Sequence, residues 1–112
     1  MDWHREYVAE SIKRFELDSF RRDPSFEWLQ LVAAQNPRIA DHARTVALEA
    51  GDTHGAAVAE TVRNSVQGRR PRVSPKQGFV VARILAEKYG TARAVAAALY
   101  GLTDEEINDA SV

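Results

Sequence analysis

The chain has 112 residues, of which 45% are hydrophobic and 28% charged, with no cysteine and a formal net charge of −1. This length suits one core, so we predict a single helical domain over residues 1–112. The lack of cysteine excludes disulfides, thiolate metal sites and cysteine nucleophiles. No apolar run approaches the roughly 20 residues that a membrane span needs, and the charged N-terminus lacks a signal-peptide core. We therefore expect a cytoplasmic protein without a membrane partner.

Charge is distributed unevenly along the chain. Residues 1–60 hold seven basic and eleven acidic residues, and residues 94–112 hold four acidic and no basic ones. Between them, residues 61–93 hold eight basic residues against Glu87 alone. One contiguous third of the sequence is therefore strongly basic and lies between two acidic flanks.

The first half of the chain predicts three helices. Apolar residues recur at steps of three to five over residues 2–20, which is typical of an amphipathic helix. Residues 23–35 and 36–51 each begin with a polar N-cap followed by Pro at the first helical position. Gly51 is the expected end of the third helix.

The second half predicts four more helical segments, at residues 52–68, 74–90, 91–101 and 103–110. The segment 74–90 is the expected centre of the fold, because its apolar residues cover most of the helix circumference. Ser74 and Gln77 form a capping box around Pro75, and Thr103 with Glu106 forms another. No stretch alternates with period two, so we predict an all-α fold, a compact bundle of six to seven short helices.

Residues 94–107 contain a spacing that is known from DNA-binding proteins. It consists of a small residue, a glycine four positions later, an apolar residue directly after it and a second apolar residue in the next helix: Ala97, Gly101, Leu102 and Ile107. The stretch resembles a helix-turn-helix, which implies two helices that touch at Ala97. The N-terminal residues of the second helix would then face base edges, but here residues 104–106 are all acidic. The alternative is an ordinary corner between two helices.

The basic third supplies the best candidate for a nucleic-acid contact. The candidate residues surround the expected start of the central helix: Arg63, Arg69, Arg70, Arg72 and Lys76. Arg83, Lys88 and Arg93 would extend this patch only if the fold gathers them on the same side. Arg donates two parallel hydrogen bonds to phosphate, and a helix N-terminus also favours phosphate. The alternative is a solvated loop that only keeps the domain soluble.

The sequence contains few patterns that are typical of enzymes. The three histidines, His4, His42 and His54, are far apart and show no metal-ligand spacing. Phosphate-binding glycine loops and nucleophile elbows are absent. We therefore expect a non-enzymatic protein with no catalytic residues, no cofactor and no metal site.

Aromatic residues concentrate near the N-terminus. Packing of the first two helices is the default interpretation, and Trp3, Tyr7 and Trp28 are the candidates for anchors at a protein interface. Such a face would suit a basic protein partner or a second copy of the chain in a homodimer.

Two functions remain open, and an enzyme is a third that a metal bound tightly through His42 or His54 would support. The first is a binding module whose residues 69–76 contact nucleic acid or a nucleoprotein complex. The second is a protein-binding adaptor or inhibitor, for example a phage- or plasmid-type accessory protein that blocks a nucleic-acid-handling machine such as a defence complex. Steep salt dependence of binding would favour the first.

Overall fold

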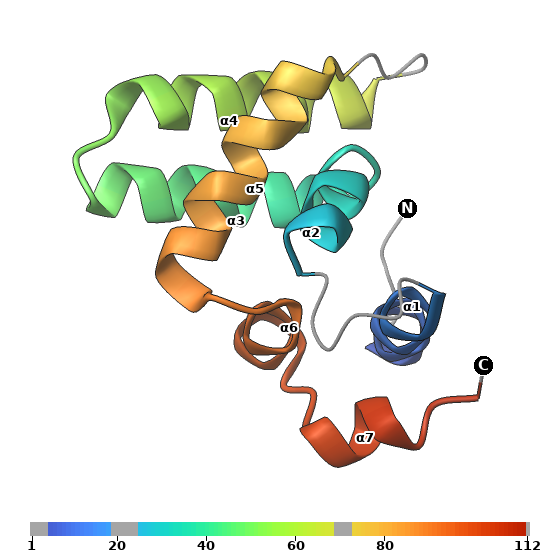
Figure 1. Cartoon of the computed structure of the whole chain (residues 1–112). Coiled ribbons are helices and arrows are strands. Elements are labelled where there is room, and N and C mark those ends of the chain that lie inside the picture. Colours follow the sequence, from blue (N-terminus) through green and yellow to red (C-terminus); the bar gives the residue numbers. More distant parts are fainter. Residues whose placement is uncertain (1–4, 19–24, 69–72, 112) are drawn as a thin grey trace.

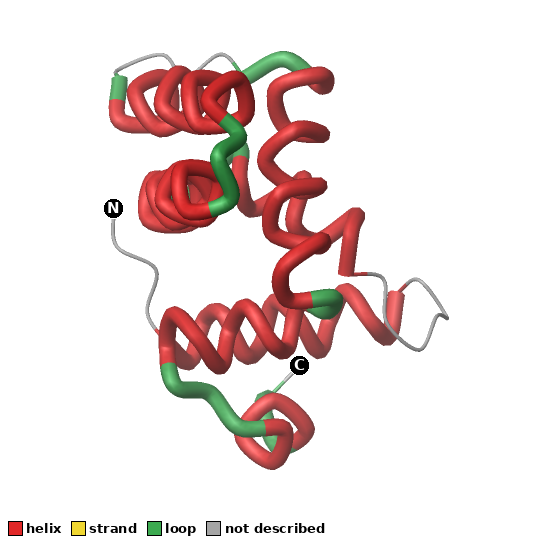
Figure 2. Tube along the Cα trace, turned by 90° about the vertical axis from the view of Figure 1, so that its left-hand side faces the viewer, coloured by secondary structure: helices red, strands yellow, loops and turns green. Residues whose placement is uncertain are grey.

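The computed structural model describes residues 5–18, 25–68 and 73–111, and the described part of the chain is all-α (Figure 1). Its helices are α1 (Arg5–Asp18), α2 (Ser25–Ala33), α3 (Pro37–Glu49), α4 (Thr53–Gln67), α5 (Pro75–Tyr89), α6 (Ala92–Tyr100) and α7 (Asp104–Asn108). Short loops join α2 to α3, α3 to α4, α5 to α6 and α6 to α7, as Figure 2 shows. No helix in this part of the chain is both long and apolar enough to cross a membrane.

The predicted N-caps that fall on described residues are confirmed. The side chain of Asn36 accepts a hydrogen bond from the Arg38 N–H. At the start of α4, the N-cap is Asp52, whose side chain accepts a hydrogen bond from the Gly55 N–H. Both predicted capping boxes are complete, with Ser74 and Gln77 at α5 and Thr103 and Glu106 at α7. The expected cap and proline of the second helix, residues 23 and 24, lie outside the described residues. Local side-chain chemistry therefore sets the helix boundaries.

α3 and α4 form an antiparallel pair, and α5 crosses both of them (Figure 1). Small side chains allow α3 and α4 to approach closely: the buried alanines are Ala40, Ala43, Ala47, Ala56 and Ala59. α5 also contacts α2 and α6, which confirms its expected place at the centre of the fold. Its apolar surface is not fully covered, however, because Phe79 remains 49% exposed while its ring packs edge-on against Phe26.

α1 packs on α6 and α7, which come from the other end of the sequence. Apolar contacts include the fully buried Val8 of α1 and Ile107 of α7. Long cationic side chains add hydrogen bonds across these helices. Arg5 donates to the carbonyl oxygens of Tyr100 (2.9 Å) and Gly101 (2.7 Å), and Lys13 donates to those of Asn108 and Ala110. Both side chains therefore satisfy carbonyls left free at the ends of α6 and α7.

The corner between α6 and α7 shares features with a helix-turn-helix but fits the alternative, an ordinary corner between two helices, better. Gly101 has a φ of +66° in the left-handed region, and Leu102 and Ile107 are buried as that motif requires. The expected contact at Ala97 is wrong, because this side chain is exposed. The physical reason is that α7 has only five residues and packs on α1, while Arg93 of α6 donates hydrogen bonds to the side chains of Asp104 and Asn108.

Candidate nucleic-acid interface

The candidate interface lies where α4 ends and α5 begins. Lys76, the second residue of α5, is exposed, and no ion pair links it to any residue that the structure describes. The first turn of α5 contains no acidic side chain that would repel an anion. Arg69, Arg70 and Arg72 belong to the segment between the two helices and lie outside the described residues. Among the predicted contact residues 69–76, the structure therefore describes the exposure of one basic side chain, that of Lys76.

Arg63, the remaining predicted contact, is engaged inside the fold. Its guanidinium lies 2.8 Å from the Asp41 carboxylate of α3 and 3.5 Å from the Glu60 carboxylate on its own helix. Only 25% of the side chain is exposed. Arg63 therefore joins α4 to α3, and we leave it out of the proposed contact surface.

Three further basic residues of the segment 61–93 also have acidic partners. Arg83 pairs with Glu87, Lys88 with Glu49, and Arg93 with Glu16 at 2.9 Å. The hydrogen bond to Glu16 is the main reason that the pKa of Arg93 is raised. Two of these partners, Glu16 and Glu49, come from the acidic first half of the sequence. Folding therefore cancels much of the charge contrast that is visible along the chain.

The three candidate anchor residues fall in different places. Trp28 is only 1% exposed, and its indole N–H donates to the Ser11 hydroxyl oxygen at 3.0 Å. Trp28 is therefore a core residue and presents no surface to a partner. Tyr7 is 53% exposed, and Trp3 lies outside the described residues.

A histidine–tyrosine pair between α3 and α5 was not predicted. His42 Nε2 and the Tyr89 hydroxyl oxygen lie 2.5 Å apart in a hydrogen bond, and the two rings are stacked. Burial lowers the pKa of His42, and the positive charge of Lys88 lowers it further. Within the described ranges, no group of three or more His, Cys, Asp or Glu side chains is arranged to hold a metal ion. The pair therefore joins α3 to α5, and burial of the ring favours its neutral form.

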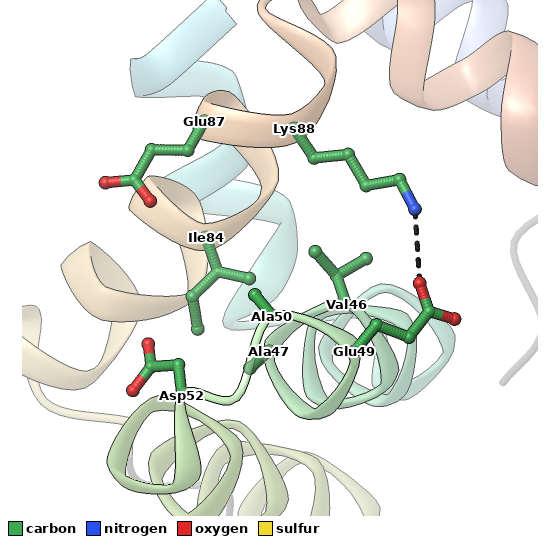
Figure 3. A pocket seen from close by; sticks show the side chains of 8 residues that line it. All are labelled: Val46, Ala47, Glu49, Ala50, Asp52, Ile84, Glu87 and Lys88. Atoms are coloured by element: carbon green, nitrogen blue, oxygen red, sulfur yellow. Dashed lines mark hydrogen bonds and ion pairs between the residues drawn. The ribbon is translucent and has the colours of Figure 1, made fainter.

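A groove at the other end of α5 was also not predicted. It lies between the last turn of α3, the N-cap of α4 and the last turns of α5 (Figure 3). Its lining combines Val46, Ala47, Ala50 and Ile84 with the charged residues Glu49, Asp52, Glu87 and Lys88. These residues are separated in sequence by up to about 40 positions, so no local pattern indicates that they meet.

No protein-family model, curated protein or solved structure matches this chain. The functional argument therefore depends on the chemistry of its own residues.

Proposed function

We propose that this protein is a small non-enzymatic binding module that contacts nucleic acid, free or within a nucleoprotein complex. The proposed contact residues are 69–76, which precede and begin α5 in the sequence; we call them the basic edge. The single observation that supports this most is that Lys76 is exposed and has no ion pair with any described residue. It follows closely in sequence on three more cations, Arg69, Arg70 and Arg72.

The chemistry of this edge suits phosphate. Arginine side chains donate parallel hydrogen bonds to phosphate oxygens, and lysine adds a compact positive charge. The positive end of the α5 dipole points toward the same edge, where no acidic side chain occupies the first turn. Contacts of this kind give affinity without base specificity.

Ion pairing and position limit the size of the contact. Arg63 and Arg93 are held in ion pairs with side chains only 25% and 27% exposed. Arg83 and Lys88 lie in the middle and the last turn of α5, away from its N-terminal end. Four cations then remain for phosphate contacts, which corresponds to a salt slope of about −3 to −4 on duplex DNA.

Fluorescence anisotropy of labelled single- and double-stranded oligonucleotides, titrated across a salt series, tests the proposal. The decisive variant carries Arg69→Ala, Arg70→Ala and Arg72→Ala. A control with the same change in net charge carries Arg14→Ala, Arg44→Ala and Arg83→Ala on other surfaces. Circular dichroism and thermal unfolding establish that both variants are folded.

We expect salt-sensitive binding by the wild type and the control, and its loss in the decisive variant. Equal weakening in both variants would mean that net charge, not this edge, causes binding. Failure of the wild type to bind any oligonucleotide at low salt would refute the proposal and leave a protein partner as the remaining candidate.

A further inference from the structure

The groove at the C-terminal end of α5 has an apolar floor and a charged rim. Figure 3 shows the side chains of Val46, Ala47, Ala50 and Ile84 between charged groups that lie around them. Asp52 and Glu87 lie on one side, and Glu49 and Lys88 form an ion pair on the other. The depression has a volume of about 510 Å³, enough to take one or two side chains of a partner.

The electrostatics of the groove favour a cation. Three carboxylates face one ammonium group, so the lining carries an excess of negative charge. Two helix C-termini, those of α3 and α5, contribute partial negative charge to its walls, against the partial positive charge of one N-terminus, that of α4. The last turn of α3 contains no basic residue that would neutralise that end.

We propose that this groove docks an arginine or lysine side chain from a basic segment of a protein partner. The aliphatic stem of such a side chain would lie on the apolar floor, and its charged head would reach the carboxylates of the rim. Lys and Arg combine an apolar stem and a charged head in this way, and no purely apolar or acidic side chain matches both parts of the groove.

The rim carboxylates are available to a partner. The Glu49 carboxylate lies 3.5 Å from Lys88, and the Glu87 carboxylate lies 3.8 Å from Arg83. Their side chains are 64% and 69% exposed, and surface pairs of this kind contribute little and exchange readily. Asp52 uses one carboxylate oxygen, Oδ1, to accept the Gly55 N–H at 2.8 Å. A docked guanidinium could therefore replace weak contacts without disturbing the fold.

This site is separate from the proposed nucleic-acid edge. α5 spans fifteen residues, which corresponds to about 22 Å between its ends. The basic edge lies at its N-terminal end and the acidic groove at its C-terminal end. The protein would thus present two surfaces of opposite charge, and either one can bind without the other.

Binding of a fluorescein-labelled ten-residue peptide that combines Arg with Leu and Ala tests the inference. A peptide with Glu in place of each Arg is the control probe. The variant Glu49→Gln/Glu87→Gln removes two rim charges, and Glu6→Gln/Glu105→Gln removes two exposed carboxylates elsewhere. Ala50→Arg fills the groove from an exposed position, and Ala57→Arg places the same side chain on an exposed position of α4.

We expect the basic peptide to bind and the acidic peptide not to bind. The rim variant should bind the basic peptide about three- to tenfold more weakly, Ala50→Arg should abolish binding, and both control variants should bind like the wild type. Amide chemical-shift changes should concentrate at residues 46–52 and 84–88.

Equal loss of affinity in the rim variant and its control would overturn the inference, since the peptide would then respond to net charge alone. Shift changes on another face would also overturn it. Oligonucleotide binding by the rim variant should stay unchanged, because the two surfaces are independent. A failure of the peptide-docking inference is therefore distinguishable from a failure of the nucleic-acid proposal.

Discussion

Two parts of the bundle are held together by different chemistry. α3, α4 and α5 pack mainly through small and branched apolar side chains, with alanine at the closest approaches. α1 is joined to α6 and α7 by fewer apolar contacts and by cationic side chains that reach carbonyl oxygens and carboxylates. The first part should therefore set the global stability, and the second should open locally at lower cost.

The largest effect is expected from a cavity in the apolar part. Leu85 of α5 is fully buried, so Leu85→Ala should lower the free energy of unfolding by about 2–5 kcal/mol. Urea unfolding followed by circular dichroism measures this. A loss below 1 kcal/mol would show that α5 is not the centre of the core.

A smaller, local effect is expected at the polar end. Arg5 donates to the carbonyls of Tyr100 and Gly101 and pairs with Glu106 at 2.7 Å. Because 48% of the side chain is exposed, Arg5→Met should cost only about 1–2 kcal/mol. Hydrogen exchange should accelerate in residues 104–108 and stay unchanged in α3 and α4. Arg14→Met, at an exposed position of the same helix, is the control, and equal acceleration there would contradict this role of Arg5.

The turn that leads into α7 provides a second test of how the polar end contributes to stability. Gly101 has a φ of +66°, and a Cβ added there would meet no atom within 4 Å. The cost of Gly101→Ala is therefore backbone strain alone, about 1 kcal/mol. Thermal unfolding measures it, and an increase in stability would contradict the left-handed conformation.

The smallest expected effect is the dependence of the free energy of unfolding on pH. The pKa of His42 is lowered in the folded protein, so the unfolded chain binds more protons near the ordinary value of 6.5. Stability is then fully present above that value and is lost as the pH falls through 6.5 toward the folded-state pKa. Lys88 and Arg38 oppose a charge on this ring, while Glu49 and Asp41 favour one.

Urea midpoints at pH 7.5 and 5.0 measure this effect. The decrease should be smaller in His42→Gln than in the wild type, and His54→Gln, at an exposed histidine, should behave like the wild type. An equal decrease in all three proteins would contradict the role of His42.

The sequence predicted local structure well because caps act within three or four residues. Asn36, Ser74 and Thr103 each form the predicted bond to a nearby N–H. Contacts between distant segments were not predictable in this way. Nothing local indicates that Arg5 meets the carbonyl of Gly101, 96 positions away, or that Ala97 stays exposed.

The candidate site shows the same limit. The excess of basic residues in 61–93 was visible in the sequence, but their partners were not. Arg63 and Arg93 find carboxylates in α3 and α1, and Glu49 and Glu87 come together at the rim of the acidic groove only through the packing of α3 against α5. Charge along a chain therefore gives a poor estimate of charge on a surface.

The salt dependence of oligonucleotide binding tests the central claim most directly. If only Arg69, Arg70, Arg72 and Lys76 contact phosphate, log K should fall with log salt at a slope of about −3 to −4 on duplex DNA. If all eight cations of the basic third contributed, the slope would approach about −7. A slope of about −3 to −4 supports the basic edge at the start of α5 as the contact surface. A slope near −7, or no binding at all, contradicts it.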